Sequence, residues 1–380
     1  MHWGNWPIIK LQKEMKFLSE YRDADLAKKY LDEIRATVTQ PWNIMEVCGG
    51  QTHSLVKNGI MTLLPDEVQM IHGPGCPVCV TPLNLIDKAI YLAEEKDVIL
   101  CSFGDMLRVP GSKKSLLQTK AAGADIRILY SPLEAVQLAS ENPDREVVFF
   151  AVGFETTAPA NALSIDKADD LGLTNYSILA SQVLVPPAME AVIEDEESKI
   201  DAFLAAGHVC TIMGMEEYYP LVAHYKIPMV VTGFEPVDLL QGILLTVQQL
   251  EKGEALLQNQ YSRVVKPEGN RKAQELLHKI FEVTDREWRG IGNIPKSGFE
   301  LRSKYASFDA NLKFSIDIPK VEEPKECIAG LVLKGIKKPM ECSQFGKKCT
   351  PQNPMGAPMV SSEGACAAYY HFSGAIETIS

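Results

Sequence analysis

The sequence predicts an α/β protein in which two parallel-sheet α/β domains flank a cleft, with a small C-terminal region built around a metal centre. Three observations support this prediction. Short apolar runs alternate with helical patterns along most of the chain, which is typical of parallel sheets covered on both faces. The chain has 380 residues, which is longer than a chain with a single hydrophobic core usually is. Four cysteines fall close together near the C-terminus, where few apolar strands are predicted.

Composition argues against several classes of protein. Hydrophobic residues make up 46% and charged residues 23%, which is ordinary for a soluble globular chain. A net charge of −11 argues against a general nucleic-acid role. The N-terminus lacks a basic start with an apolar core, and no apolar run is long enough to span a bilayer, so we expect a cytoplasmic protein. Nine cysteines in that compartment favour metal binding or catalysis over structural disulfides.

The N-terminal segment, residues 1–38, is predicted to be helical and to serve packing. Its apolar residues recur at roughly the helical period from Leu11 to Ile34, with charged residues between them. The first α/β domain is predicted over residues 39–135. Its strands are expected at residues 43–47, 68–71, 97–101 and 126–130.

The first of these strands ends in the run Cys48-Gly-Gly-Gln-Thr-His53. In open α/β sheets, functional groups collect at the carboxyl ends of strands. Gly49 and Gly50 allow the backbone to approach a ligand closely. A single cysteine beside glycines is more often buried packing. His53, five residues further on, favours a functional reading, as a ligand, a proton carrier or a cap.

Cys76 and Cys79 stand in the glycine-proline loop 71–79, directly before a predicted helix. We expect Thr81 to cap that helix and Pro82 to be its first residue, so that the helix dipole would favour thiolates in the loop. The Cys-x-x-Cys spacing indicates thiol redox chemistry or half of a metal site. No close second pair of cysteines or histidines stands nearby to complete a zinc knuckle.

Another strand-end loop, after residues 97–101, carries Asp105 and Arg108. These two side chains would form a surface ion pair or face the same cleft as Cys48. Cys101 lies within the apolar run itself, so we expect a buried structural thiol.

The second α/β domain is predicted over residues 136–255, with strands at residues 147–152, 176–183, 208–213 and 229–232. Two of these strands lead into Gly-Phe-Glu. That places Glu155 and Glu235 at strand ends, either as functional acids or as helix-capping carboxylates. The chain contains neither a P-loop nor a Gly-x-Gly-x-x-Gly fingerprint.

The remaining residues, 256–380, are predicted to be helical at first and irregular from 285 to 325. The last four cysteines then follow with the spacing C-x14-C-x6-C-x16-C: Cys327, Cys342, Cys349 and Cys366. Four thiolates suit tetrahedral zinc or a [4Fe–4S] cluster, and the spacing matches neither the usual zinc ribbon nor the bacterial ferredoxin run. Spacing alone leaves both centres open.

Together these motifs resemble the HypD family of [NiFe]-hydrogenase maturation proteins over nearly the whole chain. The matching stretches are Glu46-Val-Cys-Gly-Gly-Gln-Thr-His53, His72-Gly-Pro-Gly-Cys-Pro-Val-Cys79, Phe103-Gly-Asp-Met-Leu-Arg-Val-Pro110, Gly153-Phe-Glu-Thr-Thr-Ala-Pro159, Thr232-Gly-Phe-Glu-Pro236 and the four C-terminal cysteines.

The resemblance implies an assembly scaffold with internal redox activity. The Fe(CN)2CO unit of the hydrogenase would be built on it together with the small chaperone HypC and with HypE, which delivers cyanide equivalents. The four C-terminal cysteines would carry a [4Fe–4S] cluster. We expect a monomer until these partners bind.

The resemblance also implies roles for the remaining candidates. Cys48 would bind the transient iron together with a cysteine of the partner. Cys76 and Cys79 would cycle between dithiol and disulfide and exchange electrons with the cluster. His53 and Asp105 would lie near the iron and orient or protonate its ligands.

Two other functions compete with this reading. A thiol-disulfide oxidoreductase acting on a separate protein would need the same cysteine pair but not Cys48. A zinc-stabilised α/β binding protein would contain zinc and no iron.

Overall fold

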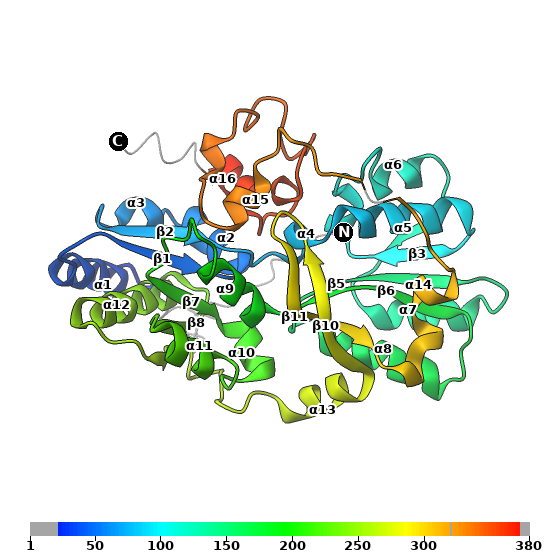
Figure 1. Cartoon of the computed structure of the whole chain (residues 1–380), viewed down its shortest axis with the longest axis horizontal. Coiled ribbons are helices and arrows are strands. Elements are labelled where there is room, and N and C mark those ends of the chain that lie inside the picture. The colour runs from blue at the N-terminus through cyan, green and yellow to red at the C-terminus, as the bar shows by residue number, and fades with distance from the viewer. Residues whose placement is uncertain (1–21, 320, 373–380) are drawn as a thin grey trace, which may run out of the picture.

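The computed structural model describes residues 22–319 and 321–372. It contains two β-sheets with helices packed against them and a smaller C-terminal region that rests on both (Figure 1). The predicted N-terminal helix is present as α1 (Ala24–Thr37), and the part of that prediction before residue 22 lies outside the described residues. The α/β class is therefore confirmed.

The first sheet, sheet A, has five parallel strands. They are β1 (Trp42–Glu46), β2 (Val68–His72), β7 (Ala202–Ala206), β8 (Met229–Thr232) and β9 (Leu257–Asn259). Their order is β2-β1-β7-β8-β9, so the direction of winding reverses between β1 and β7. Ligands of open α/β sheets bind beyond the carboxyl ends of the strands at such a reversal.

The second sheet, sheet B, has six strands in the order β10-β11-β6-β5-β3-β4. Four of them run parallel: β3 (Ile99–Ser102), β4 (Ile126–Ile128), β5 (Val147–Gly153) and β6 (Tyr176–Val183). The hairpin β10 (Phe281–Trp288) and β11 (Gly292–Leu301) adds two antiparallel strands at the edge. Every residue of β5 and β6 is buried, as expected for strands covered on both faces.

The chain crosses between the sheets, so the strands of each sheet come from both of the predicted contiguous domains. β3 and β4 were expected in the same domain as β1, but in sheet B β3 pairs with β5 and β4 pairs with β3. β7 and β8 lie in the segment predicted as the second domain, but they continue sheet A from β1. Local apolar patterns locate strands, whereas the choice of neighbour depends on crossover connections that such patterns do not encode.

Helices link the strands. In chain order they are α2 (Gly49–Lys57), α3 (Ile60–Leu63), α4 (Pro77–Val80), α5 (Leu83–Glu95), α6 (Leu116–Ala121), α7 (Pro132–Glu141), α8 (Ala158–Asp170), α9 (Val185–Ile193), α10 (Gly207–Met213), α11 (Tyr218–Tyr225), α12 (Pro236–Lys252) and α13 (Arg271–Ile280). Between β3 and α6 lies the 3-10 helix η2 (Gly104–Arg108). The helix predicted after the Cys76–Cys79 loop is present as α5, and its apolar side chains are buried along its length.

Two local predictions were wrong. Residues 208–213 form α10, and the strand is the preceding run Ala202–Ala206. Both runs are short and apolar, and such runs fit a strand or a buried helix equally well. Residues 285–301, expected to be irregular, belong to the β10–β11 hairpin. Gly290 and Gly292 form its turn at φ values of 77° and 112°, which glycine adopts without strain.

The C-terminal region, residues 321–372, consists of short elements. They are α15 (Ala329–Leu333), the 3-10 helices η4 (Pro339–Glu341) and η5 (Ala357–Met359), and α16 (Ala365–Phe372), after η3 (Ser303–Phe308) and α14 (Ala310–Lys313) earlier in the chain. α16 packs on α2, where Val56, Ala368 and Tyr369 form a small apolar cluster. The region therefore sits on the helix that follows β1 (Figure 1).

Candidate functional site

Cys48 and His208 meet at the carboxyl ends of the strands of sheet A, which we call the carboxyl edge of this sheet. Cys48 follows β1 and caps α2, and His208 follows the neighbouring strand β7. The Cys48 Sγ lies 3.5 Å from Nδ1 of His208, although 160 residues separate them in the chain. Burial lowers the pKa of His208 to about 4, so its imidazole is neutral near pH 7. The pair occupies the point where the winding of sheet A reverses.

The Cys48 thiol lies in the protein interior, with 3% of its surface exposed. Burial raises the pKa of this thiol, and the nearby carboxyls of Glu46 and Glu363 raise it further. The backbone N–H groups of Gln51 and Gly50, at the start of α2, act in the opposite direction. A thiol in this environment ionises readily only when a cation compensates its charge, as a bound metal ion does.

A chain of buried hydrogen bonds connects Cys48 with the C-terminal region. The Glu46 carboxyl accepts from the backbone N–H of Cys48 (2.9 Å) and from the Thr52 hydroxyl. Its Oε1 also lies 2.7 Å from Nδ1 of His72, and Nε2 of His72 lies 3.0 Å from the hydroxyl of Tyr369 on α16. His72 directly precedes the loop that leads to Cys76. One polar network therefore touches both cysteine loops and α16.

Cys76 and Cys79 are joined by a disulfide. Cys76 is the N-cap of the one-turn helix α4, and its Sγ accepts a hydrogen bond of 3.3 Å from the backbone N–H of Cys79. The prediction for the next helix was displaced by one residue, because Pro82 is the N-cap of α5 and Thr81 ends α4. The two sulfurs belong to a helix turn of their own.

The disulfide loop packs directly on Cys48. The backbone N–H of Gly49 donates to the carbonyl of Gly75 (2.8 Å). A Cβ on Gly75 would lie 2.2 Å from the backbone nitrogen of Cys48, which no side chain could tolerate. Cys48, Cys76 and Cys79 all line one apolar core, shared with residues that follow strands of sheet B. The structure therefore brings these three cysteines together in one core.

His53 and Asp105 gather around Glu363 of the C-terminal region. Nδ1 of His53 lies 3.1 Å from the carbonyl oxygen of Ser362. Asp105 forms the expected ion pair with Arg108 (2.9 Å). The surrounding protein and the Asp105 charge raise the pKa of Glu363, whereas His53 lowers it. Because Glu363 in turn acts on the pKa of Cys48, these residues form the polar margin of the Cys48 site.

The two strand-end glutamates have different environments. Glu155 is fully buried, its Oε1 accepts from the Val185 N–H (2.8 Å), and its Oε2 has no partner among the described residues. Burial raises the pKa of Glu155 to about 8. Glu235 is the N-cap of α12 and pairs with Arg22 (2.6 Å). Glu155 is thus a buried acid, and Glu235 is the helix-capping carboxylate that the sequence left as an alternative.

Two other cysteines are interior thiols. Cys101 in β3 and Cys210 in α10 are both fully buried, and burial raises the pKa of each to about 12. The prediction for Cys101 is confirmed.

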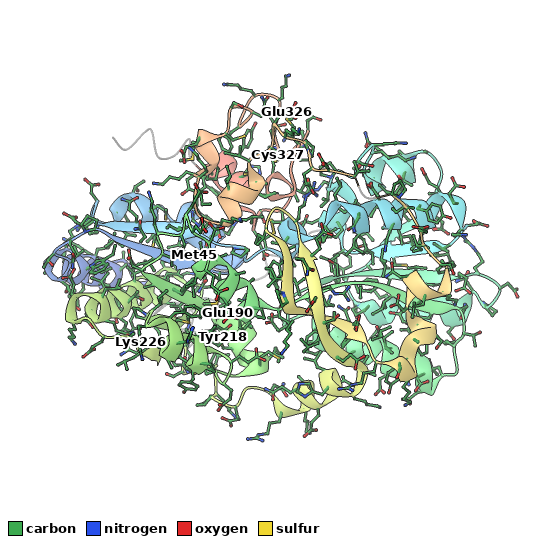
Figure 2. All side chains as sticks on the ribbon, viewed as in Figure 1. Met45, Glu190, Tyr218, Lys226, Glu326 and Cys327 are labelled. Carbon is green, nitrogen blue, oxygen red and sulfur yellow. A yellow bond between two sulfur atoms is a disulfide. The ribbon has the colours of Figure 1, made fainter. Side chains whose placement is uncertain are left out.

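The four C-terminal cysteines come from separate short elements. Cys327 precedes α15, Cys342 ends η4, Cys349 lies in a loop and Cys366 belongs to α16 (Figure 2 shows Cys327). Burial raises the pKa of Cys366, and the other three thiols each raise it further, so all three lie within electrostatic reach of Cys366.

The four thiols do not converge on one point in the described part of the chain. Among residues 22–319 and 321–372, no three His, Cys, Asp or Glu side chains converge on a point that a metal ion could occupy. A [4Fe–4S] cluster makes a different demand, because each thiolate binds its own iron and the sulfurs stand further apart than around one ion.

The surroundings of the four thiols suit a thiolate-bound group. The backbone N–H of Met355 donates to the Cys349 Sγ (3.4 Å), and the backbone of Ala329 donates toward Cys327. A Cβ on Gly356 would lie 2.4 Å from the Cys327 Sγ, so only glycine leaves room for that sulfur. Nη1 of Arg289, near Cys327, is buried and finds no acceptor in the described part of the chain. N–H donors and a positive charge are groups that stabilise thiolate-bound clusters.

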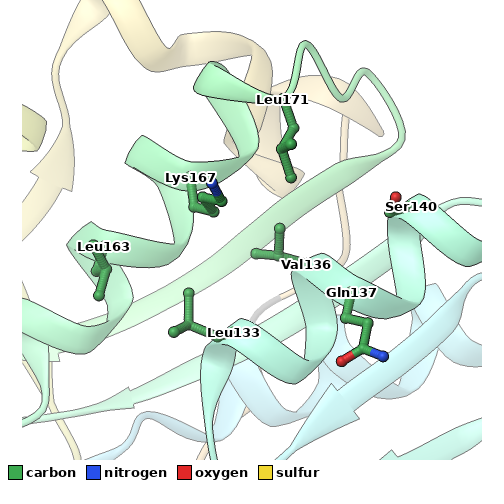
Figure 3. A pocket seen from close by; sticks show the side chains of 7 residues that line it. All are labelled: Leu133, Val136, Gln137, Ser140, Leu163, Lys167 and Leu171. Atoms are coloured by element: carbon green, nitrogen blue, oxygen red, sulfur yellow. The ribbon is translucent and has the colours of Figure 1, made fainter.

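A surface hollow elsewhere on the protein lacks such groups. It measures about 420 Å³ and lies between α7 and α8 (Figure 3). Its lining consists of Leu133, Val136, Gln137, Ser140, Leu163, Lys167 and Leu171. It is lined by none of the cysteines, so it offers no thiol chemistry.

Within the described ranges, no helix is both long and apolar enough to cross a bilayer.

Sequence reasoning missed His208 and the Glu46–His72–Tyr369 chain. His208 would have been found if the strand had been placed at residues 202–206, because it then follows a strand next to β1. The hydrogen-bonded chain joins residues up to 297 positions apart, and no local pattern links them.

Comparison with known proteins agrees with these observations. Residues 25–373 match the family model HypD, described as "Hydrogenase formation hypA family". The chain is 48% identical to the hydrogenase maturation factor HypD of Rhodobacter capsulatus over 373 residues, which cover 95% of this chain and 99% of the relative. It is 47% identical to HypD of Azotobacter vinelandii (94% and 97% covered) and 44% identical to HypD of Escherichia coli K12 (94% and 98%). The cysteine-bearing edge of sheet A and the C-terminal cysteines thus belong to a member of the HypD family.

Proposed function

We propose that this chain is a hydrogenase maturation factor on which the Fe(CN)2CO unit of a [NiFe]-hydrogenase is assembled, together with a HypC-like chaperone and a HypE-like cyanide donor. The observation that carries the proposal is the position of Cys48. Its thiol lies beside His208 at the winding reversal of sheet A and directly against the disulfide loop. The matching relatives carry the name hydrogenase maturation factor.

In this proposal the iron unit is the cargo and Cys48 is its ligand. A soft thiolate suits iron that carries cyanide and carbon monoxide. Glu46 holds the Cys48 backbone through the N–H bond of 2.9 Å, which fixes the direction of the thiol. His208 is neutral and lies 3.5 Å from the sulfur, so it serves as a hydrogen-bond partner or as a nitrogen donor to the iron.

The Cys76–Cys79 pair acts as the redox element. An external electron donor would reduce its disulfide, and the two electrons together with two protons from solvent convert it to a dithiol. Because Gly75 packs on the Cys48 backbone, opening the disulfide changes the loop that lies against the iron thiol. The network from Glu46 to Tyr369 then connects this edge with α16, which carries Cys366.

The four C-terminal cysteines would hold a [4Fe–4S] cluster, which supplies one-electron transfer when bound. The family membership, the N–H donors to Cys327 and Cys349, and the buried Arg289 charge support this assignment over zinc.

Burial argues against the alternative of a general thiol-disulfide oxidoreductase. Cys76 and Cys79 are 3% and 1% exposed, so an external protein disulfide has no direct access to either sulfur. Attack on a disulfide needs such access.

Infrared spectroscopy tests the iron-scaffold role. The chain is co-expressed with a HypC-like and a HypE-like partner and purified anaerobically, and the CN and CO bands of the complex are recorded. We expect Cys48→Ala to abolish these bands and Cys101→Ala, a matched interior cysteine, to keep them. Bands of equal intensity in Cys48→Ala would overturn the scaffold role.

Visible absorption with metal analysis tests the cluster. Anaerobically purified protein should contain about four irons and show a broad band near roughly 400 nm that bleaches with dithionite. A colourless protein that contains one zinc would assign the four cysteines to a structural site instead.

A further inference from the structure

The tip of the β10–β11 hairpin lies between the disulfide loop and the C-terminal region. The backbone N–H of Arg289 donates to the carbonyl of Val80, the residue after Cys79 (2.8 Å). On the other side, a Cβ on Gly290 would lie 2.6 Å from the Cα of Gly330 in α15. Figure 1 shows the hairpin rising to meet α15. The two groups of cysteines are therefore connected through this tip.

The side chain of Arg289 is buried at this junction. Only 4% of it is exposed, whereas its ion-pair partner Glu323, 2.8 Å from Nη2, is 40% exposed. Nη1 is buried and has no acceptor among the described residues. A guanidinium N–H left without an acceptor in the interior is unfavourable, so a single surface carboxylate does not account for this position.

The charge of Arg289 reaches Cys327. Burial raises the pKa of the Cys327 thiol, while Arg289 acts to lower it and so favours the thiolate. Arg289, Cys327 and Gly356 line the same hollow of about 310 Å³. The Arg289 side chain and Cys327 therefore border the same hollow, while the Arg289 backbone contacts the disulfide loop.

We propose that Arg289 is a positioning residue that directs a buried positive charge at the Cys327 side of the four-cysteine centre and raises the reduction potential there. This inference rests on the [4Fe–4S] cluster of the proposed function. An added electron makes such a centre more negative, so a nearby cation stabilises the reduced form. Hydrogen bonds to the sulfurs act in the same direction. Glu323 partly offsets the effect, because its carboxylate lies on the same guanidinium.

A redox titration of the purified full chain, followed by visible absorption, tests this role. With Arg289→Gln we expect the reduced-to-oxidised ratio at a fixed potential to fall about tenfold, which equals 59 mV for a one-electron couple. Glu323→Gln should raise the ratio, by less than the Arg289 change because the carboxylate is half-exposed. Arg289→Lys keeps the charge and should restore most of the potential.

The opposite signs of the two changes distinguish an electrostatic role from loss of packing, which would shift both variants the same way. Matched controls come from the other end of the hairpin. There Arg302 pairs with Glu282 at 3.8 Å, both 46% exposed, and Arg302→Gln and Glu282→Gln should leave the potential unchanged.

Three results would overturn the inference. The first is an unchanged potential in cluster-containing Arg289→Gln, and the second is a shift of the same sign in Arg289→Gln and Glu323→Gln. The third is wild-type protein without iron–sulfur absorption, which would remove the cluster from the proposed function as well. The absorption spectrum of the wild type therefore separates failure of the inference from failure of its premise.

Discussion

The carboxyl edge of sheet A and the C-terminal region both carry cysteines, but they hold them differently. Cys48, Cys76 and Cys79 follow paired strands and line a large apolar core. The last four cysteines lie among 3-10 turns and short helices, of which α16, with eight residues, is the longest in the described part of the region. The first group is positioned by the fold. We expect the second to depend on the metal centre of the proposed function, since so few regular elements hold it.

Removal of the proposed metal centre should show the difference in stability between the two regions most clearly. We expect a protease to cut within residues 321–372 at least about tenfold faster after treatment with an oxidant and a chelator, because in the proposed function the metal centre supplies the local stability there. The α/β part should resist cleavage. Mass spectrometry of the fragments over time gives the rates. Cys48→Ala, which removes a thiol of the other group, should leave them unchanged. Equal cleavage rates with and without metal would show that the region is held by its own packing.

Gly75→Ala should disturb the contact between the Cys48 loop and the disulfide loop. The new Cβ would lie 2.2 Å from the backbone nitrogen of Cys48, and backbone hydrogen bonds from Gly49 to Gly75 and from Gly75 to Gly73 hold the two loops in place. We expect a loss of about 3 kcal/mol in the free energy of unfolding, measured with urea. Gly104→Ala is the control, because its Cβ would meet only Ile128 at an ordinary 3.6 Å. A Gly75 variant as stable as that control would mean that the two loops separate easily.

Glu155 makes the stability of the folded protein depend on pH. Its pKa is about 8 in the folded protein and about 4.5 in the unfolded chain, so the folded state binds one more proton between these values. The stability from this group is full below about pH 4.5 and is lost as the pH rises towards 8, by about 1.4 kcal/mol per pH unit. Urea unfolding at several pH values should show that slope in the wild type and a flatter one in Glu155→Gln. Parallel curves would contradict the assignment.

Tyr369→Phe tests the bond that joins the two regions and should have the smallest effect. It removes only the hydroxyl that lies 3.0 Å from Nε2 of His72. The expected loss is about 1 kcal/mol, because a buried acceptor is left without its partner. Urea unfolding measures it, and Tyr370→Phe, which takes no part in this chain of bonds, is the control. No difference between the two variants would mean that water replaces the lost hydroxyl.

The sequence predicted the positions of the cysteine loops better than it predicted the membership of the two sheets. Strand-end loops have local signatures, so Cys48 after β1 and the Cys76–Cys79 pair after β2 were found and do meet. No local signature shows which sheet a strand joins. The segment that forms β3 was therefore assigned to the domain of β1, whereas β3 pairs with β5.

His208 was missed for a related reason. The apolar runs on its two sides do not distinguish a strand from a helix. The roles of His53 and Asp105 stay predictions, since the structure places both beside Glu363 and not directly on the Cys48 sulfur.

The crossing of the chain between its two sheets has a consequence for biosynthesis. The Cys48 strand is completed on one side by β7, more than 150 residues later, and sheet B receives its last strands only at residues 281–301. Such distant pairings form slowly, and they cannot form before the later segments have left the ribosome. A nascent chain that ends before β7 has Cys48 without His208. In the proposed function, iron would therefore meet Cys48 and His208 together only after β7 and the start of α10 have been made, so the order of synthesis would protect shorter chains from premature loading.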